Sequence, residues 1–256
     1  FFPTIENNGG NLTILRSKLA VGVYSGITQH SGTTTIADSA FADIAYRGIT
    51  LNGGYMEVAR TTFNKMYNGI VANGGTLAIE GNSFTDLTSI PPSAISVNGR
   101  ATTFVNHGGN SGEGAITLGL SLHKDLTLPK DGLPYAPRYV EVRSGTTLTI
   151  LPGVIMKVPM ENIAFYVTGT LVIGDAAIGA EQVVITSMND DSVGGDTNDN
   201  GSATSPHPGD WRTIIFNFGS TGTIANTIIR YGGASLRNDT GQYIRFPIIE
   251  NNGGAL

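Results

Sequence analysis

Residues 51–63 read LNGGYMEVARTTF, and the same pattern occurs in NNGGNLTILRSKL (7–19), QHSGTTTIADSAF (29–41) and ANGGTLAIEGNSF (72–84). Glycine recurs at intervals of 22, 22 and 21 residues, at Gly10, Gly32, Gly54 and Gly75. Within each segment apolar and polar residues alternate, as they do in β-strands. A unit this short cannot bury its apolar side chains alone, so successive units must stack. The sequence therefore predicts an all-β fold, a right-handed parallel β-helix (β-solenoid) with rungs of about 22 residues.

Stacking these rungs aligns three columns of side chains. The column of Leu19, Phe41, Phe63 and Phe84 is expected to fill the interior, and an aromatic strip for sugars is the alternative. A polar column is expected to form a hydrogen-bonded ladder at a turn. Its members are Asn8, His30, Asn52, Asn73 and Asn98, with a ligand-binding role for His30 as the alternative. Arg16, Asp38 and Arg60 should form an alternating charge ladder on the surface; a grip on an acidic polymer is the alternative.

The rung pattern is interrupted once, where LPKDGLPYAP (128–137) contains three prolines. Strand patterning resumes on both sides, so we expect a junction inside one continuous solenoid rather than a disordered linker. The predicted organisation is β-helix rungs over 1–118, the junction at 119–138, and further rungs over 139–256 with a long acidic loop at 189–210.

Four phrases follow one another after the junction. They are YVEVRSGTTLTILPGVIMKV (139–158), VTGTLVIGDAAIGAEQVVITS (167–187), GGDTNDNGSATSPHPGDWRTIIF (194–216) and GTIANTIIRYGG (222–233). Their order resembles the right-handed parallel β-helix repeat modules of large secreted surface proteins of bacteria and archaea. The resemblance implies a β-helix and an extracellular or cell-surface location, and it leaves the function open because such modules occur in adhesins, wall-anchored proteins and carbohydrate-associated proteins. Inward-facing pairs are expected on successive rungs at Leu148 and Ile150, Leu171 and Ile173, and Val183 and Ile185.

A longer repeat joins the two ends of the sequence. FFPTIENNGGNL (1–12) returns as RFPIIENNGGAL (245–256), with nine of twelve positions identical at an offset of 244 residues. This match predicts one period of a tandem repeat of about 244 residues plus a short overlap. Because the first residue is Phe and no signal segment is visible, we expect a processed or excerpted piece. The expected partners are further copies of the module, covalent or end to end, with a rod of roughly 50 Å per period at β-sheet spacing.

The composition excludes several functional classes. The chain has no cysteine, so disulfides and thiolate chemistry are excluded. A net charge of −5 gives no reason to expect a nucleic-acid partner. No apolar stretch reaches the roughly 18–20 residues that span a bilayer, so membrane insertion is not expected.

The acidic loop is the expected place for a metal ion. DTNDNG (196–201) matches the first half of a calcium loop, in which oxygens of Asp196, Asn198 and Asn200 point at one cation. The second half of an EF-hand is missing, because position twelve is His207 instead of Glu. A structural calcium ion is therefore the predicted cofactor, and a solvated turn is the alternative. Asp190, Asp191 and Asp210 are the candidates to complete its shell.

Trp211 directly follows this loop. We expect its ring to pack the loop against the solenoid wall, and a platform for a sugar is the alternative.

Catalysis is not predicted. β-Helix lyases need carboxylates on neighbouring rungs, whereas Glu57 has Thr13, Thr35 and Ala78 as its column neighbours. Inverting hydrolases need paired aspartates at a fixed separation, and Asp190–Asp191 is the only adjacent pair. The expected function is a non-catalytic structural module of an extracellular fibre, stalk or surface layer. A module that binds polysaccharide or cell wall is the alternative, and a polysaccharide lyase or hydrolase is the third.

Overall fold

The computed structural model describes residues 3–237 and 243–255. Every regular element in this part of the chain is a β-strand, and the strands form a parallel β-solenoid with rungs about 22 residues apart, which confirms the predicted fold class. The chain divides into two compact units. The first runs to Thr117 and includes Asp131–Leu133 and Thr197–Asp199, and the second comprises the remainder. A single solenoid across the junction stays a prediction.

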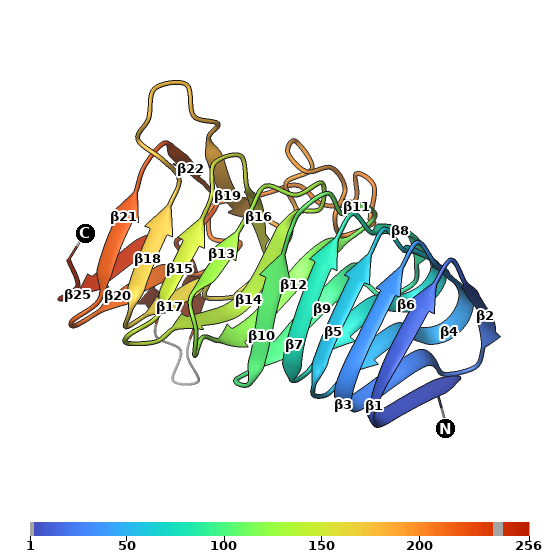
Figure 1. Ribbon diagram of the computed structural model, residues 1–256. Helices are drawn as coiled ribbons and strands as arrows, with labels where there is room; N and C mark the ends of the chain where they lie inside the picture. The colour runs from blue at the N-terminus through green and yellow to red at the C-terminus, as the bar shows by residue number, and fades with distance from the viewer. Residues whose placement is uncertain (1–2, 238–242, 256) are drawn as a thin grey trace. The chain divides into compact units, whose positions relative to one another are not determined.

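In the first unit the strands stack in three columns of parallel neighbours, and β1, β3, β5 and β7 follow one another along one of them (Figure 1). The strands are β1 (Ile5–Leu15), β2 (Lys18–Gly22), β3 (Ser25–Ala37), β4 (Ala40–Leu51), β5 (Tyr55–Ala59), β6 (Thr62–Ala72), β7 (Gly75–Glu80), β8 (Ser83–Leu87), β9 (Ser93–Gly99), β10 (Thr102–Asn106), β11 (Ser111–Gly112) and, at the boundary of the units, β12 (Ala115–Ser121).

The interior of the first unit is built from columns of similar side chains. One column aligns Ile27, Ile49, Ile70 and Ile95, none of which has exposed surface. Another aligns Phe41, Phe63 and Phe84, whose ring centroids are 5.1 and 5.0 Å apart. These three rings are fully buried, which confirms the predicted interior stack for the phenylalanines and leaves no aromatic face there for a sugar. Leu19 aligns with Phe41 as predicted but is half-buried. Each stacked pair contributes about 0.5–1.5 kcal/mol beyond its area burial.

One corner of three successive rungs places a charged residue in the left-handed backbone region. The φ angle is 47° at Arg16, 51° at Asp38 and 47° at Arg60. Arg60 donates two hydrogen bonds to the Asp38 carboxylate, at 2.7 and 3.1 Å, and this contact holds the pKa of Asp38 below its ordinary value. The predicted charge ladder therefore forms between these two residues. Both side chains are exposed, so solvent screens most of the attraction.

The glycine column is required by close approach of successive rungs. A Cβ atom on Gly54 would lie 2.2 Å from the carbonyl oxygen of Gly32, and φ at Gly54 is +80°. Only glycine tolerates both conditions, which explains why it recurs once per rung.

The predicted asparagine ladder forms in one step. Asn73 Nδ2 donates to Asn52 Oδ1 at 3.2 Å on the exposed surface. Asn98 instead donates to Ser96 of its own strand, at 3.0 Å. Ala72 aligns with Val97, so the strands keep their register up to these asparagines, and the ladder ends because the Asn98 amide bonds within its own strand.

The first two members of that column separate because the strand register shifts. Asn8 aligns with Ser31 rather than with His30. The imidazole Nε2 of His30 lies 3.4 Å from the Glu6 carboxylate, on the solvent side. The ladder prediction is therefore wrong for Asn8 and His30.

A different polar ladder, which was not predicted, runs through the interior of the first unit. The backbone N–H of Thr61 donates to Asn82 Oδ1 at 3.0 Å, and Asn82 Nδ2 donates to Asn110 Oδ1 at 3.1 Å. Asn110 Nδ2 in turn donates to the Asp131 carboxylate at 2.8 Å. Asn82 and Asn110 have no exposed surface, so this ladder satisfies buried polar groups at one corner of successive rungs.

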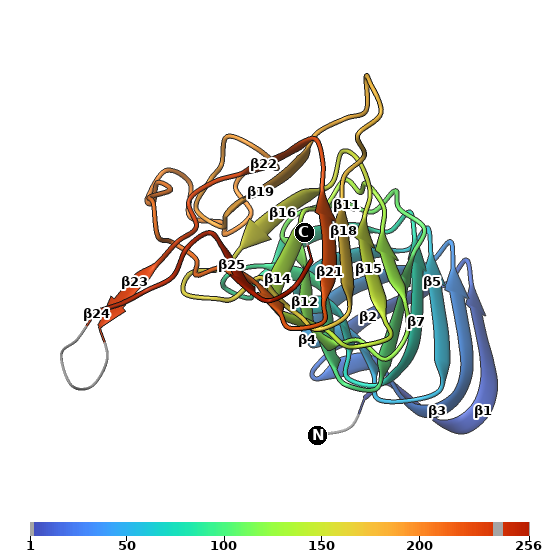
Figure 2. The same ribbon diagram turned by 90° about the vertical axis from the view of Figure 1, so that its left-hand side faces the viewer.

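The second unit also stacks its strands in columns, and β15, β18 and β21 lie side by side (Figures 1 and 2). Its strands are β13 (Leu126–Leu128), β14 (Tyr135–Val142), β15 (Thr147–Ile150), β16 (Ile155–Val158), β17 (Phe165–Val167), β18 (Thr170–Ile173), β19 (Val183–Ser187), β20 (Ile214–Asn217), β21 (Thr221–Ile224), β22 (Thr227–Ile229), β25 (Ile249–Asn252) and the antiparallel pair β23 (Ser235–Arg237) and β24 (Tyr243–Arg245).

The inward pairs of β15 and β18 align residue by residue and are fully buried, as predicted. The pair on β19 does not form the next step of that column. Ile185 aligns with Met156 of β16, in a different column, and β21 takes the place above β18. The loop at 174–182, between β18 and β19, carries the chain from one column to the other, which the alternation of apolar residues alone could not show.

Candidate functional site

The segment Ile-Glu-Asn-Asn-Gly-Gly, at 5–10 and again at 249–254, closes the same turn at both positions. Asn7 Oδ1 accepts hydrogen bonds from the N–H groups of the two glycines that follow, at 3.1 and 2.8 Å, and Asn7 Nδ2 donates to the second glycine's carbonyl at 3.0 Å. Asn251 makes the same three bonds to its own glycines, at 3.1, 2.8 and 3.1 Å. An asparagine that closes its own turn fixes the local backbone. Both copies therefore have the same preformed conformation.

The two copies pair with opposite neighbours in chain order. In the first copy Ile5 aligns with Ile27 of β3, the strand that follows it. In the second copy Ile249 aligns with Ile214 of β20, a strand that precedes it. A strand inside a sheet has a neighbour on each side. Each copy thus has the neighbour that the other one lacks among the described strands.

The same residue is buried in one copy and exposed in the other. Asn7 is 6 % exposed, and its Nδ2 atom also donates to Thr34 Oγ1 of the following rung at 3.1 Å. Asn251, which lies in the same turn, is exposed. The difference comes from the rung that covers the first copy.

The predicted calcium loop is closed by hydrogen bonds of its own. The Asp196 carboxylate accepts hydrogen bonds from the N–H groups of Asn200 and Gly201, at 3.2 and 2.7 Å, and so closes a turn. Asn200 Nδ2 donates to Thr204 Oγ1 at 2.8 Å. Within residues 3–237 and 243–255, no three side chains of His, Cys, Asp or Glu come together closely enough to hold one ion. Calcium binding by Asp196, Asn198 and Asn200 stays a prediction.

Asp190 has a structural partner. Its carboxylate lies 2.5 Å from Arg230 Nη2 and accepts hydrogen bonds from the hydroxyls of Thr186 and Ser192, at 2.5 and 2.6 Å. Burial alone would raise the pKa of Asp190, but these hydrogen bonds and the Arg230 charge outweigh it and lower the pKa. The side chain is 2 % exposed, so it is held away from a solvent-borne ion.

The other two aspartates of the predicted shell are also engaged. Asp210 accepts hydrogen bonds from Ser187 Oγ at 2.5 Å and from the His207 N–H at 3.2 Å. Asp191 lies 3.9 Å from the Nζ atom of Lys157, which has no exposed surface and donates to the Gly195 carbonyl. Burial lowers the pKa of Lys157. These contacts fasten the loop to the solenoid.

Trp211 is fully buried, and its Nε1–H donates to the Arg230 carbonyl at 3.0 Å. A Cβ atom on Gly232 would lie 2.7 Å from the indole ring, so the ring packs flat against that backbone. This position confirms the expected packing role of Trp211 and corrects the alternative, ligand-binding interpretation, because a sugar platform needs an exposed ring face. The indole ring packs the loop against the strands.

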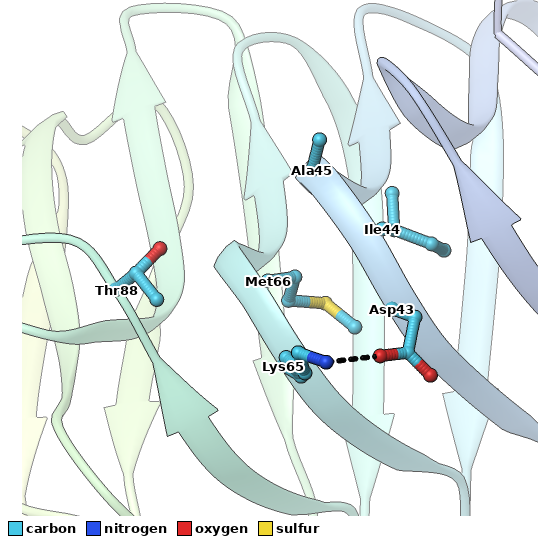
Figure 3. A pocket seen from close by; sticks show the side chains of 6 residues that line it. All are labelled: Asp43, Ile44, Ala45, Lys65, Met66 and Thr88. Atoms are coloured by element: carbon cyan, nitrogen blue, oxygen red, sulfur yellow. Dashed lines mark ion pairs between the residues drawn. The ribbon is translucent and has the colours of Figure 1, made fainter.

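A cavity of about 350 Å³ on the first unit is bordered by an exposed ion pair between Asp43 and Lys65, 2.8 Å apart (Figure 3). The hydrogen bond lowers the pKa of Asp43 and raises that of Lys65. Ile44 and Met66 form its apolar floor. The charges at its rim are already paired, so this cavity offers no free charged group to a ligand.

Three tyrosines that were not predicted as a group stack on the surface of the first unit. The ring centroids of Tyr24 and Tyr46 are 5.2 Å apart, and those of Tyr46 and Tyr67 are 5.6 Å apart. The guanidinium group of Arg47 lies 4.5 Å from the centre of the Tyr46 ring and donates to the Tyr46 hydroxyl at 3.0 Å. The spacing of 22 and 21 residues between the tyrosines is the sequence signal that identifies this column.

Comparison of the chain with protein-family models, with curated proteins and with solved structures finds no significant match in any of the three. None of the described residues belongs to a helix long and apolar enough to cross a bilayer.

Proposed function

We propose that the chain is a non-catalytic structural module of an extracellular β-solenoid array. In this array, residues 245–256 of one module stand in the place of residues 1–12 of the next. The observation that supports the proposal most strongly is the Ile-Glu-Asn-Asn-Gly-Gly segment, which has one conformation at both positions and complementary strand neighbours. Merging the two copies gives one strand between β20 of one module and β3 of the next.

Continuity of the apolar core supports the merged strand. In the second unit Phe165, Ile214 and Ile249 form one column, and in the first unit Ile5, Ile27 and Ile49 form another. Ile249 and Ile5 are the half-buried ends of these columns, whereas their neighbours Ile214 and Ile27 have no exposed surface. A merged isoleucine would join the two columns without a break, and full burial of such a side chain is worth about 1.5–3 kcal/mol.

The residues that follow the turn of the repeated segment also have complementary neighbours in the two copies. Ala255 forms a parallel bridge with Thr221, and the equivalent Asn11 aligns with Thr33. Because the residues on both sides of the turn have complementary neighbours, one rung of the array would contain the junction.

Covalent continuation fits the overlap better than stacking of separate chains. Each chain carries both copies of the segment, so two chains docked end to end would bring two identical strands to one position. In a covalent array the segment occurs once per junction, and the period is the 244-residue offset. The array also covers strand edges that would otherwise promote aggregation.

The contacts of the acidic residues favour a structural role over catalysis. Asp190, one of the two adjacent aspartates, is buried in an ion pair with Arg230, and Asp191 faces Lys157. The extracellular location in the proposal is supported by the resemblance of residues 139–233 to modules of secreted surface proteins.

The proposal is tested by electron microscopy of a chain with four successive 244-residue periods. We expect rods with an axial repeat of roughly 40 Å, the value given by about 8 turns of about 4.8 Å each. Ile249→Asp at the internal junctions should break the rods at those points, whereas Ile178→Asp is the matched control because Ile178 is fully exposed. Separate, randomly oriented particles joined by flexible segments would contradict the proposal.

A further inference from the structure

A pocket of about 390 Å³ lies wholly on the first unit, next to the stacked tyrosines. Tyr24 lines the pocket together with polar side chains from successive rungs. The polar lining residues are Glu6, Thr28, His30, Arg47, Thr50, Asn52 and Asn73. Hydroxyl, amide, imidazole and charged groups thus converge on one surface, with both hydrogen-bond donors and acceptors.

Arg47, which lines this pocket, is held in place by its contacts with Tyr46. The Tyr46 ring and hydroxyl fix the guanidinium group of Arg47. Its Nε–H is buried and has no hydrogen-bond acceptor among the residues that the structure describes. The Nε–H has no accessible surface and is out of reach of a ligand, so Arg47 serves the pocket as a preorganised charged side chain on its wall.

We propose that this pocket binds a saccharide, with the guanidinium group of Arg47 as the charged donor to a sugar oxygen. A saccharide presents many hydroxyl groups that both donate and accept, which matches the mixed lining of Thr28, Thr50 and Asn52. The edges and hydroxyls of the tyrosine stack add amphipathic surface beside it. The inference does not depend on the proposed array, because the single chain already carries every residue that lines the pocket. In the array, the repeated segment would supply the same two residue types, proline and glutamate, as Pro247 and Glu250.

The charges in the pocket disfavour other ligands. Phosphate and nucleic acid are bound by several cations together, whereas here one arginine lies with one glutamate, Glu6, whose carboxylate is 3.4 Å from His30. An acyl chain would need an apolar lining. A polyhydroxylated ligand with little net charge is the class that remains.

The test is calorimetric titration of the full chain with neutral oligosaccharides of β-glucan, chitin and xylan as probes. We expect at least one probe to bind, and Arg47→Met to weaken that binding by about tenfold to a hundredfold, as loss of a charged hydrogen bond does. Thr50→Val removes a pocket hydroxyl with little change in shape and should also weaken binding. Thr149→Val, on β15 of the second unit, is the matched control and should bind as the unchanged chain does.

Unchanged thermal unfolding of the variants shows that the loss of binding is local. Absence of binding by all three probes would overturn the proposal, as would binding that Arg47→Met and Thr50→Val both leave unchanged. Either result would leave the array untouched, because the array is judged from the junction segment alone.

Discussion

Replacement of Asn82 by leucine should destabilise the first unit more than any polar-to-apolar substitution on its surface. Asn82 has no exposed surface and links three rungs through its side chain. Its Oδ1 atom accepts from the Thr61 N–H at 3.0 Å, and its Nδ2 atom donates to the Val58 carbonyl at 2.9 Å. Leucine has nearly the same size but satisfies neither group.

The magnitude follows from the two groups that lose their partners. An unsatisfied buried N–H or C=O costs about 1–3 kcal/mol, so Asn82→Leu should lower the free energy of unfolding by about 2–6 kcal/mol. Asn82→Ser should cost less, because Ser39 occupies the same column and its hydroxyl accepts from the Ser17 N–H at 3.1 Å. The serine thus restores one of the two contacts.

The assay is urea unfolding of the full chain, monitored by circular dichroism. The matched control is Asn73→Leu, since Asn73 belongs to the exposed step with Asn52 and should change stability by no more than about 0.5 kcal/mol. Equal losses for Asn82→Leu and Asn73→Leu would refute the reasoning, because burial of the polar ladder is the only difference that it uses.

Three further results are expected. Phe63→Ala should lower the free energy of unfolding by about 4–6 kcal/mol, because it leaves a cavity and removes two stacked pairs; a loss under about 1 kcal/mol in urea unfolding would contradict this. Because the pKa of Asp190 is lowered in the fold, the stability that its carboxylate contributes is fully present above its ordinary pKa of about 3.9. That stability is lost as the pH falls through the lower folded pKa. Asp190→Asn should therefore flatten the decrease of Tm in acid, and an unchanged slope would count against the ion pair. If Asp196 helps to hold calcium, the ion at about 100 times its Kd should stabilise the fold by about 2.7 kcal/mol, a chelator should reverse this, and Asp196→Asn should abolish it.

Much of the fold could be predicted because the rungs repeat at a nearly constant interval. Glycine recurs once per rung at the position of Gly54, where backbones approach closely. Phenylalanine recurs at the position of Phe63, in an interior column. Both features leave a periodic signal in the sequence. The charge ladder was predictable for the same reason, since Asp38 and Arg60 are 22 residues apart.

The wrong or unresolved predictions concern positions where the spacing between rungs changes, or where one side chain could either pack in the interior or bind a ligand. A one-residue register shift at Asn8 broke the predicted ladder, while Asn82 and Asn110, 28 residues apart, formed an unpredicted one. An intervening loop changes the spacing in sequence without changing the position in the rung. For Trp211, an isolated aromatic residue carries no periodic signal, so only the structure separates packing from exposure.

The central claim is that one Ile-Glu-Asn-Asn-Gly-Gly segment joins successive modules. The direct measurement is hydrogen exchange, followed by mass spectrometry, of two modules in one chain, comparing residues 249–254 at the internal junction with the same segment at the C-terminal end. The account predicts strong protection at the junction, where the strand has a neighbour on each side, and faster exchange at the terminal copy. Equal exchange rates in the two copies would contradict it.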